Sequence, residues 1–336
     1  MSKKTKSIIN ILLLVLITGL VLFFSLKDNF REVIDQILHL NPLYLLLAIA
    51  LMVCYWIFRS ISIHAVITKF DPTYTKWKSF RMILMTQFFN AITPFATGGQ
   101  PFQIYALKKE GISITSGTNI IMQNFIVYQI ALVFLGVLAV LYNSIFHVLA
   151  GSPILKTLVT IGFLINTFVV IFLFLIAFGK KFNTFVMKHA ISILDKLHLV
   201  KDKEKKVEEW NQYISNFHKG AKKLLSDRKM FISTILTNFL ALVCLYLVPL
   251  AILYGMGHYE IGIINTLVCS AYTMLMGSFV PIPGGTGGLE YGYTRFFGNF
   301  VKGPILNASM LLWRSITYYL DMIIGALALN FKTKRK

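Results

Sequence analysis

Long apolar runs divide this chain, and short polar or charged segments separate them. About 20 consecutive apolar residues suffice to cross a bilayer as a helix. Runs of this kind predict about six spanning helices, near residues 8–26, 43–62, 117–141, 153–178, 230–253 and 303–329. Two further apolar segments, residues 80–107 and 263–300, are each interrupted by proline and glycine. The pattern predicts an all-α polytopic membrane protein that forms one integral membrane domain over residues 1–336.

The first apolar run follows Lys3, Lys4 and Lys6 and so has the charge pattern of a secretory signal. It is longer than a signal core and lacks a small-residue cleavage site. We therefore expect residues 1–30 to contain a retained N-terminal membrane helix.

The two interrupted segments carry related phrases. Residues 94–99 read PFATGG and residues 283–288 read PGGTGG, an offset of 189 residues. Proline removes a helix hydrogen bond and glycine tolerates unusual backbone angles, so each phrase should end a helix at membrane depth. Non-helical backbone is tolerated there only when protein buries it or when it lines a wet cavity. The phrases predict two re-entrant, broken hairpins, which in transporters are the best sequence pointer to a binding site.

The flanking helices extend the same correspondence. Each half contains a helix, a broken hairpin and a second helix, and a shift of 189 places one half on the other. We expect a first repeat at residues 41–141, a connector helix at 153–178 and an inverted second repeat at 230–329. The alternative is that the phrases recur by chance and that both are ordinary loops.

The basic residues predict the orientation of the chain. The formal net charge is +19, and 27 of the 33 lysines and arginines fall on one side of the predicted topology. The segments on that side are residues 1–7, 59–81, 108–109, 179–229 and 331–336. Cytoplasmic loops carry an excess of lysine and arginine, so both termini are expected in the cytoplasm. The composition, rich in lysine and isoleucine, favours a bacterial cell membrane.

The basic loop at residues 179–229 has apolar positions at three- and four-residue spacing, with lysines on the other faces. This pattern predicts two amphipathic helices on an anionic leaflet, which makes anionic membrane lipids expected partners. A solvated linker with helical patches is the alternative.

Each glycine pair should open a short helix whose free amide groups face the protein centre. Helix N-termini bind phosphate through these amides and the helix dipole. A lipid head group bound there is the predicted substrate. The candidate head-group residues are Asn90, Thr97, Gly98, Gly99, Gln100, Gly287, Gly288, Glu290 and Arg314.

Arg314 lies near the middle of the last predicted helix, where a charge is costly and usually marks a pathway or a buried pair. It could hold a substrate phosphate, or it could neutralise Glu290, and the two roles can coexist. Asp321 shares a helix face with Arg314 but lies about 10 Å away along the axis, too far for a direct pair. Arg59 lies nearer a helix end, where its side chain can extend toward water.

Several chemistries have no sequence support. The chain has no phosphate-binding loop of the GxxxxGK type and no paired-histidine spacing typical of metal sites, so we expect neither a cofactor nor a metal. No nucleophile-and-base pattern predicts catalytic residues. With 56% apolar residues and a mean hydropathy of +0.68, the charge indicates membrane orientation rather than nucleic-acid binding. The oligomeric state is left open.

At the two breaks the chain resembles the lysylphosphatidylglycerol synthase transmembrane, or flippase-like, family. The resemblance rests on the phrase at residues 90–105, the phrase at 281–290, and Arg314 with Tyr318 and Tyr319 in the last helix. It covers nearly the whole chain. In long members, such as the bacterial multiple peptide resistance factor, the similar region moves aminoacylated phosphatidylglycerol between leaflets.

The resemblance implies a flippase-like transporter of an anionic or aminoacylated phospholipid. Long members add a soluble domain that transfers lysine from lysyl-tRNA to the lipid, and we expect this chain to lack it. Two rivals are phosphatidylglycerol lysyltransferase activity, as the family name implies, and translocation of a polyprenyl-linked glycolipid. A third is a non-transporting role beside a separate lipid-modifying enzyme.

Overall fold

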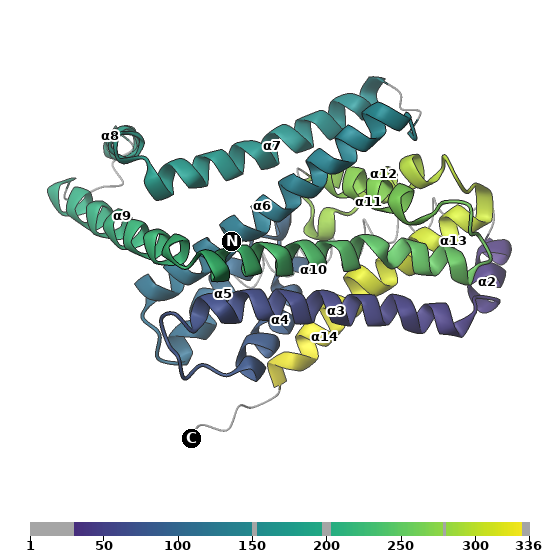
Figure 1. The fold of residues 1–336 in the computed structure, drawn as a ribbon, viewed down its shortest axis with the longest axis horizontal. Helices are drawn as coiled ribbons and strands as arrows, with labels where there is room; N and C mark the ends of the chain where they lie inside the picture. Colours follow the sequence, from purple (N-terminus) through teal and green to yellow (C-terminus); the bar gives the residue numbers. More distant parts are fainter. Residues whose placement is uncertain (1–29, 150–152, 197–202, 278–279, 331–336) are drawn as a thin grey trace.

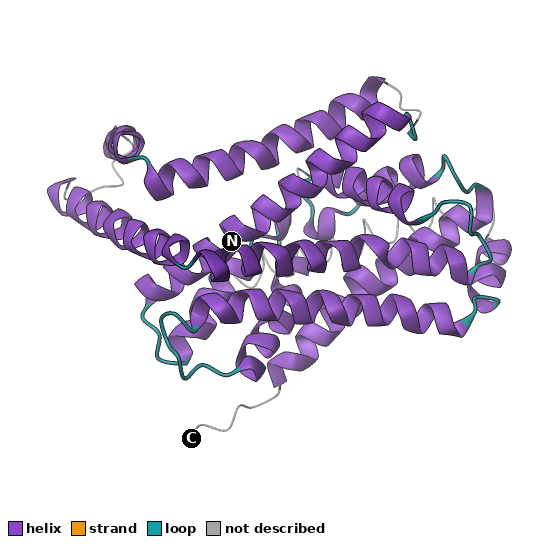
Figure 2. Ribbon diagram, viewed as in Figure 1, coloured by secondary structure: helices purple, strands orange, loops and turns teal. Residues whose placement is uncertain are grey.

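The computed structural model describes residues 30–149, 153–196, 203–277 and 280–330, and the helix predicted at residues 8–26 lies outside them. All regular secondary structure in these ranges is helical (Figure 2). The first described part of the chain contains α2 (Phe30–Leu38), α3 (Pro42–Ile67), α4 (Lys76–Ala91), η1 (Pro94–Ala96), α5 (Gly99–Lys109) and α6 (Ile114–Phe146). Next come α7 (Pro153–Phe178), α8 (Lys180–Lys196) and α9 (Lys203–Ser226). The remainder comprises α10 (Arg228–Gly255), α11 (Ile263–Gly277), η2 (Pro283–Gly285), α12 (Gly288–Phe297), α13 (Gly303–Arg314), η3 (Ser315–Tyr319) and α14 (Leu320–Asn330).

Four of the described helices are long and apolar enough to cross a bilayer: α3, α6, α10 and Pro153–Ile176 within α7. The last predicted span is also helical throughout residues 303–330, but η3 inserts a π-helical segment between α13 and α14. The prediction of an all-α polytopic membrane protein is confirmed.

Polar side chains fix where the long helices begin. Asn41 accepts a hydrogen bond from the amide of Leu43 at 3.0 Å and precedes Pro42 at the first helical position. Asp227 accepts from the amide of Met230 at 2.9 Å and caps α10 in the same way. Such caps satisfy amides that have no partner within the helix.

The bundle is built on the contact of α3 with α10, which lie side by side along the long axis of the molecule (Figure 1). Their shared core includes the fully buried side chains of Met52, Ile63 and Leu242. In the same bundle α14 packs along α4, and it approaches closely at Gly325. A Cβ atom there would lie 2.6 Å from the carbonyl oxygen of Leu84.

Helices α8 and α9 lie at one end of the bundle, together with the α3–α4 and α5–α6 connections (Figure 1). We call this the α9 end. Within the predicted amphipathic loop, the described residues form α8 and α9, and α9 packs against α6 and α7. Beside α9, Lys69 Nζ lies 2.6 Å from Asp227 Oδ2. The hydrogen bond from Lys69, reinforced by the Met230 amide, lowers the pKa of the Asp227 carboxyl.

Candidate functional site

The two broken hairpins meet inside the bundle. The first runs from α4 through η1 to α5, and the second runs from α11 through η2 to α12. The short turns η1 and η2 contact each other, although they lie in opposite halves of the sequence. Phrases that are 189 residues apart therefore form one continuous region.

The two breaks begin with the same backbone conformation. Thr93 has φ −118° and ψ 143°, and Ile282, 189 residues later, has φ −112° and ψ 141°. Two positions further on, Phe95 has φ 53° and ψ 18° while Gly284 has φ 67° and ψ 9°. The two turns therefore begin alike, and they diverge at Thr97 (φ −83°, ψ −10°) and Thr286 (φ −58°, ψ 138°).

The turn uses the left-handed region twice in succession, and the two breaks fill it with different residues. Gly284 and Gly285 adopt φ 67° and 62° without steric cost, whereas Phe95 and Ala96 adopt φ 53° and 52° with a Cβ atom present. Left-handed backbone costs a non-glycine residue about 1–2 kcal/mol. Strain of this kind tends to cluster at functional sites. The first break is therefore the strained one.

A buried ion pair lies behind the second break. Arg314 Nε is 2.8 Å from Glu290 Oε1, and the two side chains are only 7% and 10% exposed. The same guanidinium donates from Nη2 to the carbonyl of Gly284 at 3.1 Å and to Thr286 Oγ1 at 3.3 Å. Glu290 Oε2 accepts from the amide of Gly287 at 2.7 Å, closing the N-terminus of α12. Helix α12, the turn and the last helix are thus held by one network.

This network shows one of the two roles expected for Arg314. In this structure Arg314 neutralises Glu290. The Glu290 carboxylate also accepts the hydrogen bond of the Gly287 amide at the start of α12, where a phosphate was predicted to bind. The guanidinium also lies 4.4 Å from the ring centroid of Tyr318. The hydroxyl of Tyr318 donates to the carbonyl of Ala91 at 3.1 Å, at the end of α4. The pair is therefore linked to the first hairpin through Tyr318.

The candidate residues of the first break lie in a different environment. Thr97 is exposed, and its hydroxyl donates to a backbone carbonyl of its own turn at 2.9 Å. The amide of Gly98 donates to Thr93 Oγ1 at 2.8 Å. Gly99 is buried against the Asn90 side chain, which leaves no room for a Cβ atom. Asn90 and Gly99 therefore form a close internal contact, while Thr97 faces outward.

The remaining candidates divide in the same way. Gln100 is partly exposed at the start of α5. Gly288 packs against Val280, where a Cβ atom would lie 2.3 Å from a methyl carbon of that side chain. Thr286 is 2% exposed. The first break is accessible and the second is enclosed, which the sequence did not indicate.

A second polar network crosses three long helices. Arg59 Nη1 donates to Asn238 Oδ1 at 2.7 Å, and its guanidinium lies 4.1 Å from the ring centroid of Tyr128. Asn238 Nδ2 donates to Ser62 Oγ at 2.6 Å, and Ser62 donates to Asn124 Oδ1 at 2.9 Å. Arg59 is thus held between helices, and the expectation that it extends to the helix end is wrong. In the sequence, the sign of this network was the presence of single amide side chains, such as Asn124 and Asn238, within apolar runs.

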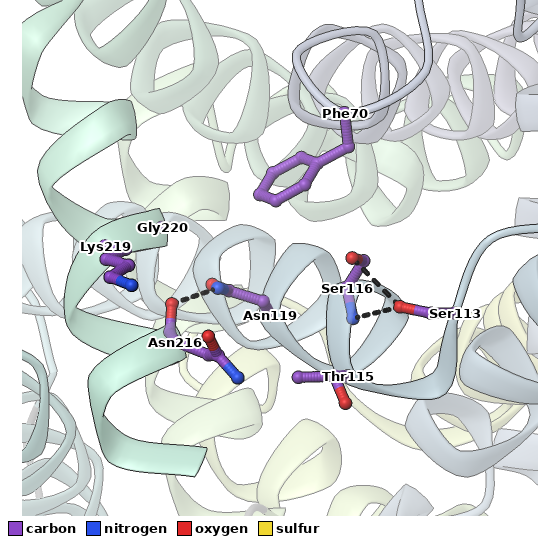
Figure 3. A pocket seen from close by; sticks show the side chains of 8 residues that line it. All are labelled: Phe70, Ser113, Thr115, Ser116, Asn119, Asn216, Lys219 and Gly220. Atoms are coloured by element: carbon purple, nitrogen blue, oxygen red, sulfur yellow. Dashed lines mark hydrogen bonds between the residues drawn. The ribbon is translucent and has the colours of Figure 1, made fainter. Parts of the chain in front are cut away.

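A pocket of about 400 Å³ lies at the α9 end, where Phe70 points toward the start of α6 (Figure 3). Its lining residues are Phe70, Ser113, Thr115, Ser116, Asn119, Asn216, Lys219 and Gly220. Asn119 Nδ2 donates to the carbonyl of Asn216 at 2.6 Å, tying α6 to α9. No lining residue belongs to either break, so this pocket is separate from the predicted head-group site.

Long apolar helices, together with two helical breaks that touch, define a polytopic α-helical membrane protein. Residues 10–325 match the family model described as Lysylphosphatidylglycerol synthase TM region, and the chain belongs to this family. It is also similar to a UPF0104 membrane protein of Archaeoglobus fulgidus, with 23% identity over an alignment of 337 residues. The alignment covers 96% of each of the two chains.

Proposed function

We propose that this chain is a flippase-like transporter that moves an anionic or aminoacylated phospholipid, of the lysylphosphatidylglycerol type, between leaflets. The family supplies the lipid class, because its description names a lysylphosphatidylglycerol synthase membrane region. The observation that carries the proposal is the contact of η1 with η2, which joins the two breaks at one place in the bundle.

The transport mechanism would rest on two inverted repeats, residues 41–141 and 230–329. Their support is the backbone match of Thr93 with Ile282 and of Phe95 with Gly284 at one constant offset. Inverted repeats with broken helices permit one half to rock against the other around a shared site. Helix α7 would be the connector that allows the second half to invert.

The basic segments support an orientation with both termini in the cytoplasm. The α3–α4 connection, the end of α5 and helices α8 and α9 all lie at the α9 end (Figure 1). These segments carry most of the lysines and arginines assigned to the inner side of the predicted topology. The positive-inside rule then makes the α9 end cytoplasmic.

In this proposal the head group first meets the accessible break. Thr97 and Gln100 would offer polar groups there, while the acyl chains stay in lipid. Movement of the halves would then separate Arg314 from Glu290, and the lipid phosphate would replace Glu290 as the partner of Arg314. Arginine suits this exchange because its planar fork matches carboxylate and phosphate geometry equally well.

Reconstitution into liposomes with fluorescent phosphatidylglycerol or lysylphosphatidylglycerol tests the proposal. The wild-type protein should move the label between leaflets, and Gln100→Ala should slow it severalfold without changing the fold. Gln212→Ala, on the exposed face of α9, is the matched control and should behave as wild type. Arg314→Ala should abolish movement. Failure of the wild-type protein to move either lipid would refute the proposal.

The same assay with a labelled polyprenyl-linked sugar tests the alternative cargo. Movement of that lipid alone would replace the phospholipid in the proposal. Formation of a new lipid from phosphatidylglycerol and lysyl-tRNA by the purified chain would instead favour the transferase alternative.

A further inference from the structure

Asp321 is an acidic residue within the apolar helix that ends the bundle. It lies in α14, seven residues beyond Arg314, and the π-helical segment η3 separates the two. Its Oδ1 accepts a hydrogen bond from the indole Nε1 of Trp56 at 2.5 Å. Trp56 is 5% exposed in α3, whereas Asp321 keeps partial exposure. Among the described residues, the Trp56 indole is the side-chain donor to this carboxyl group, which keeps some access to its surroundings.

The cations of the bundle interior are bound elsewhere. Arg314 pairs with Glu290, Arg59 bonds an amide on α10, and Arg81 Nε donates to a backbone carbonyl of α14 at 3.1 Å. Across the residues that the structure describes, no lysine, arginine or histidine forms an ion pair with Asp321. An acidic group without a cation in a membrane span usually marks an ion or proton pathway.

The helices packed around Asp321 contribute few other titratable groups. From α3, Tyr55 lies close enough to interact electrostatically with Asp321. The π-helical segment contributes Tyr318 and Tyr319, whose rings contact each other at 5.1 Å between centroids. Helix α4 contributes Arg81. Tyrosine is neutral near pH 7, so Asp321 is the acidic group whose charge can change at this place.

The bond to Trp56 joins the two halves of the chain. Trp56 belongs to α3 and Asp321 to α14, 265 residues later. A hydrogen bond to an ionised carboxylate is roughly twice as strong as a bond to a neutral carboxyl. The attraction between α3 and α14 therefore depends on whether Asp321 carries a proton.

We propose that Asp321 is a proton-binding site whose loading and release are coupled to the movement of α14 against α3, so that a proton gradient drives lipid movement. This inference rests on the function proposed above. A proton from water on one side of the membrane adds to the carboxylate and forms the neutral acid, which weakens the bond to Trp56. Release to the other side restores the carboxylate, with no covalent change elsewhere.

Proton binding can be measured without transport. Infrared difference spectra of the purified full chain, recorded as the pH is changed, should contain a carboxylic-acid carbonyl band that Asp321→Asn abolishes. Asp321→Glu should restore a shifted band. Asp35→Asn is the matched control, because the Asp35 side chain is exposed on α2, and it should leave the band in place. A band identical in wild type and Asp321→Asn would overturn the assignment.

Coupling is measured in liposomes that hold a pH gradient and fluorescent phosphatidylglycerol. One proton per lipid at a one-unit gradient permits about a tenfold difference of label between leaflets. We expect accumulation in wild type and in Asp35→Asn, and an equal distribution in Asp321→Asn. A pH-sensitive dye inside the liposomes reports proton entry. Proton entry should accompany lipid movement in wild type and should be absent in Asp321→Asn.

The outcomes separate this inference from the proposed function. Lipid movement that ignores the pH gradient would overturn proton coupling and leave the transporter intact. A sodium gradient that replaces the proton gradient would also overturn it. Absence of lipid movement under every condition would refute the transporter, whereas the infrared band would still report the proton site.

Discussion

The buried pair of Glu290 with Arg314 gives the sharpest test of how the second break is held. The substitution Glu290→Gln keeps the size and shape of the side chain but removes its charge. Arg314, only 7% exposed, would then be a buried cation without a counter-ion. The new amide group would also face the amide of Gly287, which currently donates to Glu290 at 2.7 Å.

The expected loss of stability follows from these contacts. Removing one partner of a buried ion pair costs about 3–5 kcal/mol. Loss of the helix cap adds about 1 kcal/mol. Two donors from Arg314 to Gly284 and Thr286 are retained and offset part of the loss. We expect Glu290→Gln to lower the free energy of unfolding by about 3 kcal/mol.

Denaturant-induced unfolding in detergent, followed by tryptophan fluorescence, measures this change. Glu110→Gln is the matched control: Glu110 pairs with Lys78 at 2.7 Å, but the side chains are 29% and 31% exposed. An exposed pair contributes at most about 1 kcal/mol.

A double-mutant cycle of Glu290→Gln with Arg314→Gln should give a coupling of about 1–3 kcal/mol. Equal losses for Glu290→Gln and Glu110→Gln, with no coupling to Arg314, would refute the reasoning.

Three further outcomes follow from the backbone and from the α9 end. Ala96→Gly should raise the free energy of unfolding by about 1 kcal/mol, because it relieves left-handed strain. Gly284→Ala, at φ 67°, should lower the free energy of unfolding by at least as much. Changes of the same sign for the two substitutions in one unfolding assay would contradict this prediction. The pKa of Asp227 is lowered in the folded chain, so its bond to Lys69 stabilises the fold at pH values above the ordinary carboxyl pKa. This stabilisation is lost as the pH falls through the lowered pKa. Asp227→Asn should therefore reduce the dependence of the free energy of unfolding on pH in the acidic range. Gly220→Leu should displace α9 from α6, because a Cβ atom at Gly220 would lie 2.2 Å from the Asn119 side chain of α6. Limited proteolysis should then detect new cleavage sites.

The sequence predicted the elements of the fold because their signals are local. Apolar runs identified α3, α6, α7 and α10 to within a few residues. Proline and glycine together identified both breaks, since Pro94 and Pro283 lack an amide hydrogen and the glycines beside them permit non-helical backbone. Proline alone does not end a helix in this chain, because Pro249 lies inside α10. The match of Thr93 with Ile282 in backbone angles is the same local information expressed in structure.

Other features required the packed chain. Phe95 and Ala96 have no sequence signal for left-handed backbone, and only the surroundings of the first break impose it. The π-helical segment after Arg314 likewise has no proline or glycine to announce it.

By itself, the sequence determined the membrane class, the four long apolar helices and the two related breaks, because hydrophobicity and backbone restriction act over a few neighbouring residues. Only the tertiary structure decided that Arg314 binds Glu290, that one break is enclosed and the other accessible, and that Trp56 meets Asp321. These contacts join residues up to 265 positions apart. Their partners are chosen by how helices pack, which no local pattern encodes.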